Sequence, residues 1–422
     1  MSLAMCSWSV FDGLTNESLI LEQNTYRGEY HDYRLDSAYQ PIISPTHKRI
    51  VGFEALIRCS HPDNIPNPKS LFELASSMNE SVELDHLTRM LHLLNFQAPA
   101  GPFWLFLNVH THILNHGDLF LEALQELLTK VNIKPEQIVL EILEDSIHDT
   151  DKLNHFVNLQ RDNGFLIAID DFGAGESNFN RIWEIQPDIV KLDRSLLTKA
   201  ETNPAARRLL PGIVALLKRN GCLVLFEGVE TENQLEMALE SEVDMMQGYY
   251  FAKPSAHTTD TTFNPEALEQ AKQNHHKNQI NHKRAKEAKA RRLRFEVNQV
   301  AACLEDGVSL AEACESLLTL PVVKRCFLLN SQGIQKGDSI CGKVASLSRR
   351  FHPLMEADGA SWTHREYFQH AIATDEIFVS EEYIALPDAV STMTVSKRVN
   401  FGDQVLVLCV DLAPEYLLVA EG

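Results

Sequence analysis

The stretch Leu166–Asp170, with the sequence LIAID, is followed at once by a second aspartate, Asp171, and it decides how the first half of the chain folds. A short apolar run of this kind is typical of a buried strand, and the two carboxylates mark the point where the strand ends. Seven similar runs lie between residues 36 and 256, separated by helical patterns such as Ala206–Asn220. With Leu166–Asp170, the expected strands are Gln40–Ile43, Arg49–Ile57, Phe103–Asn108, Ile138–Ile142, Ile189–Leu192, Leu223–Glu227 and Met245–Tyr249. Strands that alternate with helices predict a parallel α/β fold, and eight strands over this length suit a TIM-like (β/α)8 barrel.

Side chains capable of chemistry stand at the C-terminal ends of these expected strands. They are Asn108, Glu141, Asp170, Asp171, Lys191, Asp193, Glu227 and Gln247. In a barrel all these ends meet on one face, which is where barrel enzymes place their active sites. In an open sheet the same ends would spread along an edge. The repeated pattern therefore favours the closed barrel.

The character of the sequence changes after Pro254. Residues 264–316 hold almost no glycine or proline, which predicts one long helix or a broken pair of helices. The basic segment Lys277–Arg294 lacks a large apolar face, so a solvated connecting helix is favoured over a nucleic-acid arm or a membrane-surface helix. From residue 318 onwards, strand-like runs surround the helical pattern Trp362–Ala373 and predict a small α+β domain. The expected divisions are an N-terminal extension at 1–35, the barrel at 36–256, a helical linker at 257–317 and the small domain at 318–422.

Composition narrows the class of protein further. The formal charge of −20 at pH 7 disfavours general binding to DNA, which is itself a polyanion. The longest apolar runs, such as Phe103–Val109, are far too short to span a bilayer, and the N-terminal region shows no secretory signal. Eight cysteines are scattered without CxxC pairs, which is typical of reduced thiols. We therefore expect a cytoplasmic protein with no DNA partner and no membrane span.

The segment Gly52–Arg58, GFEALIR, contains the three residues Glu54-Ala55-Leu56 that name the EAL phosphodiesterases. Further motifs of that family occur in the family's order, namely Gln40-Pro41, Asn108, Glu141 with Glu144, Asp170–Gly173 (DDFG), Lys191–Asp193 (KLD), Glu227–Thr231 (EGVET) and Gln247–Tyr249 (QGY). From residue 36 to residue 256 the chain therefore resembles the EAL family. The resemblance implies metal-dependent hydrolysis of the bacterial second messenger cyclic di-GMP to linear pGpG. No GGDEF-type cyclase motif accompanies these residues, so we expect no synthesis of the messenger.

The family resemblance implies a metal site. A phosphodiester resists water because its anionic oxygens repel a nucleophile, and divalent cations neutralise that charge while lowering the pKa of a bound water. Mg²⁺ and Mn²⁺ prefer oxygen ligands. By resemblance, two such ions are held by Glu54, Asn108, Glu141, Asp170 and Asp171.

The resemblance also assigns roles around the metals. Lys191 and Glu227 are expected to orient the attacking water and to take its proton, with a buried ion pair as the alternative. The implied substrate-binding residues are Gln40, Leu56, Arg58 and Gln247. The arginine offers a rigid donor fork that suits a phosphate group. Glu144 matches the family glutamate that fastens the loop after the aspartate pair.

Three departures from the family pattern bear on activity. The loop after Gly175 reads Glu176-Ser177-Asn178, where the family has an aromatic residue followed by small ones, and this loop couples metal binding to dimer packing in the family. Cys59 replaces a common tryptophan, and Phe226 replaces a small residue. None of these changes removes a metal ligand. They leave open a second hypothesis, a receptor that binds cyclic di-GMP without cutting it and signals through a partner, and a third, a scaffold that uses neither nucleotide nor metal.

A pair of histidines, His110 and His112, follows Asn108 and has a spacing that could bind zinc. No cysteine or third histidine stands at a suitable local distance to complete such a site. We therefore interpret the pair as loop histidines.

Residues 318–422 resemble a PAS-like or Cache-like sensor domain. The resembling stretches are Phe327–Gly333, Trp362–Phe368 and Val379–Tyr383. Such domains enclose a small ligand, and Arg365 and Tyr383 are candidates to grip a carboxylate. The alternative is that the aromatic side chains only form core contacts in a dimerisation module. Together with the long helix, the resemblance implies a homodimer whose activity the C-terminal domain tunes.

Overall fold

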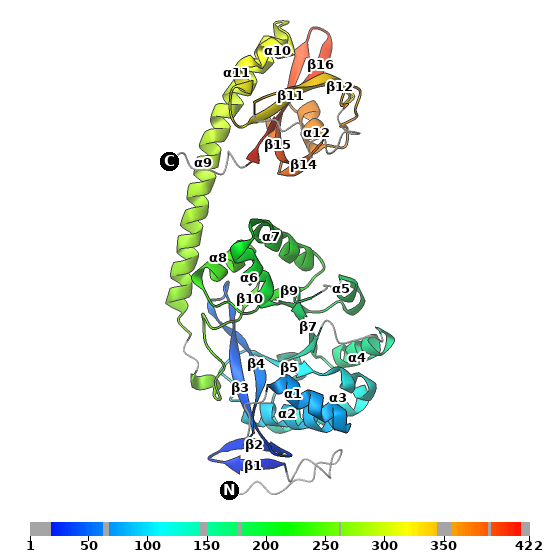
Figure 1. Cartoon of the computed structure of the whole chain (residues 1–422), viewed down its shortest axis with the longest axis vertical. Coiled ribbons are helices and arrows are strands. Elements are labelled where there is room, and N and C mark those ends of the chain that lie inside the picture. Colours follow the sequence, from blue (N-terminus) through cyan, green and yellow to red (C-terminus); the bar gives the residue numbers. More distant parts are fainter. Residues whose placement is uncertain are drawn as a thin grey trace. The chain divides into compact units, whose positions relative to one another are not determined.

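The computed structural model of the chain describes residues 18–61, 67–143, 150–175, 179–260, 263–343, 356–386 and 390–414. The chain divides into two compact units, residues 1–275 and residues 276–422 (Figure 1). None of the helices in these described ranges carries an apolar stretch long enough to cross a bilayer.

The first unit contains a closed barrel of eight strands. These are β3 (Tyr33–Ser44), β4 (Arg49–Ser60), β5 (Trp104–Val109), β6 (Ile138–Leu143), β7 (Leu166–Phe172), β8 (Ile189–Leu192), β9 (Leu223–Phe226) and β10 (Met245–Met246). The strands follow one another around the barrel from β4 to β10, and β3 pairs with both β10 and β4 to close the ring. The prediction of a TIM-like barrel is thereby confirmed.

One strand of the barrel departs from an all-parallel arrangement. Strands β4 to β10 pair in parallel, whereas β3 is antiparallel to both of its neighbours. The reason is the short connection at residues 45–48, because a tight hairpin can join only antiparallel strands and a parallel crossover needs a dozen residues or more. Lys48 in this hairpin adopts a left-handed backbone conformation with φ of 53°. The start of β3 is extended by two further strands, β1 (Leu19–Glu22) and β2 (Thr25–Tyr30), so residues 19–30 belong to the same sheet.

Helices cover the outside of the barrel. Around the barrel strands, the described helices of eight or more residues are α1 (Pro68–Met78), α2 (Ser81–Asn95), α3 (Gly117–Val131), α4 (Thr150–Asp162), α6 (Arg194–Thr202), α7 (Pro204–Arg219) and α8 (Glu232–Glu240), with the shorter α5 (Phe179–Ile185) between α4 and α6. Local sequence explains their starts and packing. Asn203, for example, caps α7 by accepting hydrogen bonds from the next turn, and Pro204 occupies the first helical position. Leu210, Val214 and Leu217 then recur at helical spacing and are buried against the barrel.

A layer of apolar side chains fills the barrel interior, and its members are Ile42, Phe106, Val139, Ala168, Ile189, Leu225 and Met245. Successive side chains of a strand alternate between its two faces, so the residue two positions away also points inward. Two positions beyond Phe106, Val139, Ala168, Ile189, Leu225 and Met245 stand Asn108, Glu141, Asp170, Lys191, Glu227 and Gln247, and two positions before Ile42 on the reversed β3 stands Gln40. The same alternation that builds the core therefore delivers these polar side chains to one end of the barrel.

The second unit is a small α+β domain preceded by a long helix. Its elements are α9 (Pro265–Glu305), α10 (Leu310–Ala313), α11 (Glu315–Leu318), β11 (Val323–Asn330), β12 (Gln335–Cys341), α12 (Glu366–Ala373), β13 (Phe378–Val379), β14 (Tyr383–Ala385), β15 (Val390–Phe401) and β16 (Gln404–Leu412). The helix α9, which begins in the first unit, is continuous rather than a broken pair. The antiparallel sheet has the order β12-β11-β16-β15-β13, with β14 also paired to β15. The helical pattern Trp362–Ala373 corresponds to α12, which begins at Glu366 rather than at Trp362.

Candidate active site

A buried lysine lies at the centre of the polar end of the barrel. Lys191, on β8, is fully buried, and its Nζ contacts carboxylates from four other strands or strand ends. The distances from Nζ are 2.6 Å to Glu141 Oε1, 2.6 Å to Glu227 Oε1, 2.8 Å to Asp170 Oδ1 and 3.3 Å to Glu54 Oε1. The structure therefore brings together both expected catalytic residues and three of the five expected metal ligands.

The fourth expected carboxylate reaches the cluster through an irregular backbone. The pairing of β7 with β8 shifts register between Ile169 and Phe172, and Asp171 has a left-handed φ of 57°. In a regular strand Asp170 and Asp171 would point to opposite faces. This bulge instead places carboxylate oxygens of Asp170, Asp171 and Glu227 within 4.8 Å of one another.

Burial and the excess of negative over positive charge determine the pKa values of the groups in the cluster. Burial alone would lower the pKa of Lys191, but the surrounding carboxylates of Asp170, Glu141, Glu227 and Glu54 outweigh it and hold that pKa well above its usual value. Burial raises the pKa of Glu141 and of Glu227 well above the usual range, although Lys191 acts against it. Burial and the nearby Asp170 carboxylate raise the pKa of Asp171 to about 6.

The donor set fits divalent cations. The carboxylate oxygens of Glu54, Glu141 and Asp170 lie within 4.8 Å of one another, so these three groups can share one ion. Glu141 Oε1 lies close to the lysine, yet neither of the two buried oxygens of Glu141 accepts a hydrogen bond of good geometry within the described part of the chain. Asn108 stands beside Glu141 in the strand register and adds an amide oxygen. Hard cations such as Mg²⁺, Mn²⁺ or Ca²⁺ take oxygen ligands of this kind.

Two of the expected substrate-binding residues support the cluster, Gln247 by direct contact and Gln40 through Gln247. Gln247 Nε2 donates a hydrogen bond of 2.6 Å to Glu54 Oε2 and lies 3.2 Å from Gln40 Oε1. Gln40 in turn donates to the backbone oxygen of Ala252. Both glutamines are buried. Their positions fix the orientation of Glu54.

The other two expected substrate-binding residues line a cavity of about 570 Å³ beside the cluster. Leu56 and Arg58 extend from β4 into its wall, and Asn108 and Asp171 join it to the carboxylates. The remaining described wall comes mainly from α1, α2 and the segment after β5, including Lys69, Phe72, Arg89, His92 and His110. The cavity is large enough for a ligand of nucleotide size.

Sequence reasoning missed Arg89 in this wall. Arg89 is buried, forms an ion pair with Asp85 one helical turn earlier, and stacks 4.3 Å from the centre of the Phe120 ring. Burial lowers its pKa to about 9. An arginine in an amphipathic helix usually marks the solvent side, so no local signal distinguishes this one.

His110 and His112 do not form a metal centre with other described residues, and His112 lies in a short 3-10 helix (Thr111–His116) rather than in a loop. His110 packs on Phe72, with ring centres 3.7 Å apart, and burial lowers its pKa to about 4. His112 is exposed, and the groups capable of holding a metal within the described ranges contain only carboxylates.

The departures from the family motifs fall outside the carboxylate cluster or outside the described residues. Phe226 is buried in the apolar layer between the strands and the surrounding helices, and Cys59 is half-buried on β4. Glu144 and the loop at 176–178 lie outside the described residues, so the expectations placed on them stay predictions.

The C-terminal unit has a smaller cavity of about 200 Å³. Tyr383 lines it, and the Arg365 guanidinium lies 4.9 Å from the centre of the Tyr383 ring. A buried ion pair between Arg325 and Asp411, with Nε and Oδ2 2.7 Å apart, forms part of the same wall. Tyr367 belongs both to this wall and to the apolar core beneath it.

Comparison with known proteins agrees with this geometry. The model of the EAL domain family matches residues 23–254, which is more than half of the chain. The uncharacterised EAL-domain protein YkuI of Bacillus subtilis is 31% identical over 222 residues, covering 51% of this chain and 54% of that protein. The cyclic di-GMP phosphodiesterase RocR of Pseudomonas aeruginosa is 31% identical over 233 residues, covering 54% of this chain and 58% of that protein. The chain thus matches about half the length of these curated relatives.

The crystal structure of YkuI from Bacillus subtilis, in complex with cyclic di-GMP and calcium, is similar over both units. It covers 92% of this chain and 96% of its own, with a TM-score of 0.75 and 24% sequence identity. At that identity the likeness establishes the fold, including the presence of a C-terminal sheet domain.

Proposed function

The chain belongs to the EAL domain family, and from this premise we propose that it hydrolyses cyclic di-GMP to linear pGpG with the help of two divalent cations. The observation that carries the proposal is a cluster of five carboxylates around one buried lysine, adjoining a cavity of about 570 Å³. RocR, the relative from Pseudomonas aeruginosa, is named a cyclic di-GMP phosphodiesterase.

The number of cations follows from the charges in the cluster. Glu54, Glu141, Asp170, Asp171 and Glu227 oppose the single positive charge of Lys191. Burying the four uncompensated negative charges would be costly, so the groups must either bind protons or bind cations. Two divalent ions such as Mg²⁺ or Mn²⁺ neutralise them, with Glu54, Asn108, Glu141, Asp170 and Asp171 as ligands. When bound, such ions lower the pKa of a water and polarise the phosphate.

The remaining residues of the cluster handle the water and its proton. Lys191 holds the attacking oxygen in place through its ammonium group, and Glu227 accepts the proton. The water oxygen then bonds to phosphorus while one phosphorus–oxygen ester bond of the ring breaks, and the leaving oxygen takes up a proton. Arg58 and Leu56 contact the substrate in the adjoining cavity, and Gln40 and Gln247 hold Glu54 in its productive orientation.

The C-terminal unit is proposed to tune this activity. Its resemblance to PAS-like and Cache-like sensors supports a role in sensing, and its small cavity beside Arg365 and Tyr383 supports binding of a small carboxylate. We further propose a homodimer that works in the cytoplasm. Analytical ultracentrifugation tests the dimer, and a purely monomeric protein at micromolar concentration would contradict it.

A receptor without turnover is the second candidate. The residues Glu176-Ser177-Asn178, which depart from the family pattern, favour it. The two candidates separate in one experiment, in which calorimetry measures binding of cyclic di-GMP with Ca²⁺ and chromatography measures products with Mg²⁺ or Mn²⁺. Appearance of pGpG establishes the enzyme. Saturable binding with no product under either metal establishes the receptor, and no binding at all refutes both.

A further inference from the structure

The first unit has another cavity, of about 400 Å³, at the end of the barrel opposite to the carboxylate cluster. Its walls are the first residues of parallel strands, whereas the carboxylates stand at the strands' C-terminal ends. Val51, Trp104, Leu223 and Met245 line it from β4, β5, β9 and β10. The hairpin at residues 45–48 forms its rim.

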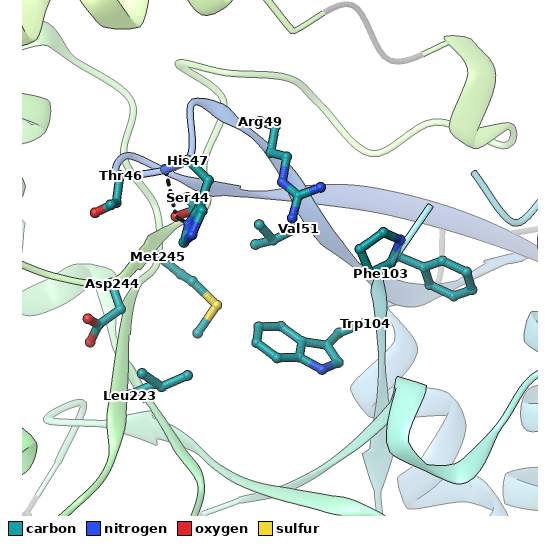
Figure 2. A pocket seen from close by; sticks show the side chains of 11 residues that line it. Ser44, Thr46, His47, Arg49, Val51, Phe103, Trp104, Leu223, Asp244 and Met245 are labelled. Atoms are coloured by element: carbon teal, nitrogen blue, oxygen red, sulfur yellow. Dashed lines mark hydrogen bonds between the residues drawn. The ribbon is translucent and has the colours of Figure 1, made fainter. Parts of the chain in front are cut away.

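One side of this cavity offers a flat aromatic surface. The Trp104 indole extends from β5 into the space, and Leu223 and Met245 lie across from it (Figure 2). Trp104 is only half-buried, although it packs against the interior layer of the barrel, and 39% of Leu223 is exposed. Apolar walls with a few convergent polar groups are typical of small-molecule sites.

The charged group at the rim that has no partner among the described residues is a guanidinium. Arg49 is exposed and has neither an ion-pair nor a hydrogen-bond partner among the residues that the structure describes. The carboxylate of Asp244, by contrast, is already engaged, because Oδ1 lies 3.0 Å from Lys218 Nζ and Oδ2 accepts a hydrogen bond from the Val224 backbone. An anionic group entering this cavity would therefore meet one unpaired guanidinium and a carboxylate whose charge is compensated.

The rim is held in place before any ligand arrives. Lys272 Nζ, on the first turns of α9, donates a hydrogen bond of 2.8 Å to the backbone oxygen of Pro45. Lys48 Nζ forms an ion pair of 2.7 Å with Glu269 of the same helix. Within the hairpin, Ser44 Oγ lies 2.9 Å from His47 Nδ1. Because the rim is already ordered, less conformational entropy is lost when a ligand binds.

We propose that this cavity is a binding site for a small planar aromatic anion. The ring stacks on the Trp104 indole, and a carboxylate or phosphate group pairs with the fork of the Arg49 guanidinium. The volume of the cavity lies within the range of small-molecule sites, which is about 300–1,000 Å³. The site is separate from the carboxylate cluster, so it does not depend on the proposed phosphodiesterase activity.

The test uses a charged probe and its neutral counterpart. Isothermal titration calorimetry compares 2-naphthoate with 2-naphthalenemethanol on the full chain. The wild-type protein is expected to bind one equivalent of 2-naphthoate, about tenfold or more tightly than the alcohol, because a hydrogen-bonded charge pair contributes on this scale. In Arg49→Gln this preference is lost, whereas Arg208→Gln, an exposed arginine of α7 outside the cavity, retains it.

A cavity-filling variant locates the bound probe. Leu223→Trp fills the mouth of the cavity and is expected to abolish binding of both compounds, with folding checked by circular dichroism. The proposal is overturned if 2-naphthoate shows no saturable binding, if Arg49→Gln binds it as the wild type does, or if a folded Leu223→Trp protein still binds it. Arg49 is a surface residue, so its variant keeps the test decisive even where the tryptophan variant fails to fold.

Discussion

Lys191 and Glu141 form an ion pair across the barrel interior, with Nζ and Oε1 2.6 Å apart on strands that are separated by β7. The same ammonium group serves Asp170, Glu227 and Glu54. One positive charge is thereby shared among four carboxylates, and the proposed function assigns the remaining negative charge to divalent cations. Under the proposed function, the stability of the barrel depends on metal binding, and this dependence leads to the following predictions.

Replacing Lys191 with methionine removes the only cation that contacts the cluster within the described residues. We expect turnover of cyclic di-GMP to fall by about 10²–10⁴-fold, the range for a lost acid–base or water-positioning group. The metal-free protein should also lose stability, because breaking a buried ion pair costs about 3–5 kcal/mol. Steady-state kinetics and urea unfolding measure the two effects. Lys199→Met, an exposed lysine on α6, is the control and should match the wild type.

Stabilisation by metal should grow with pH. The pKa of Asp171 is raised to about 6, so between about pH 4 and 6 the metal-free folded protein holds a proton that the unfolded chain has released. Folding stability without metal therefore falls as pH rises through this window, and Glu141 and Glu227 act in the same direction. Cations replace the protons, so the rise in Tm caused by Mn²⁺ over a chelator should increase from pH 5 to pH 7. A rise that is independent of pH would contradict this account, and Asp171→Asn should flatten the dependence.

Gln247 is expected to act on the metal through Glu54. Its Nε2 donates a hydrogen bond of 2.6 Å to Glu54 Oε2, so Gln247→Leu removes the group that orients this ligand. Loss of such an outer contact typically weakens metal affinity by about 10–100-fold. Titration of activity with Mn²⁺ should show a higher metal requirement in the variant, with activity recovering at saturating metal. Gln369→Leu, in the second unit, should leave the titration unchanged, and an unaltered requirement in Gln247→Leu would refute the role.

Removing one member of the buried ion pair of Arg89 and Asp85 on α2 should lower the free energy of unfolding. Replacing both members with apolar residues should change it much less. Arg89→Met leaves the Asp85 carboxylate without its partner, and we expect a loss of about 3–5 kcal/mol in the free energy of unfolding. The double variant with Asp85→Leu removes both charges and should recover most of that loss. Urea unfolding of the two single variants and the double variant measures the coupling. Simple additivity of the two single changes would show that the pair contributes nothing.

Much of the candidate site could be predicted because it follows from strand periodicity. Apolar residues such as Phe106, Val139 and Ala168 point into the barrel, and the polar residue two positions later must point the same way. When this rule is applied to each strand, it places the polar side chains inside the same end of the barrel, and no side-chain contacts need to be known. The closed barrel, predicted from the number of strands and the polar residues at their ends, is confirmed. The structure also brings Lys191 together with its carboxylates, whereas the catalytic and metal-binding roles given to these residues stay predictions.

Other features could not be predicted because they depend on tertiary context. The reversal of β3 follows from the hairpin at residues 45–48. Ser44-Pro45 favours a turn there, but the local sequence does not show that the two flanking strands pair directly with one another. The bulge that turns Asp171 toward the cluster is visible only as a register shift and a left-handed φ. Arg89 is buried because Asp85 and Phe120 surround it, and nothing in its local sequence distinguishes it from an exposed arginine.

The most direct test of the account is turnover of cyclic di-GMP by wild-type protein and by Glu54→Ala, with products separated by chromatography. With Mg²⁺ or Mn²⁺, the wild type should convert the substrate to pGpG, and both a chelator and the Glu54→Ala change should abolish the product. Equal turnover in Glu54→Ala, or turnover that survives removal of metal, would contradict the claim that this carboxylate cluster holds the cations that cut the substrate.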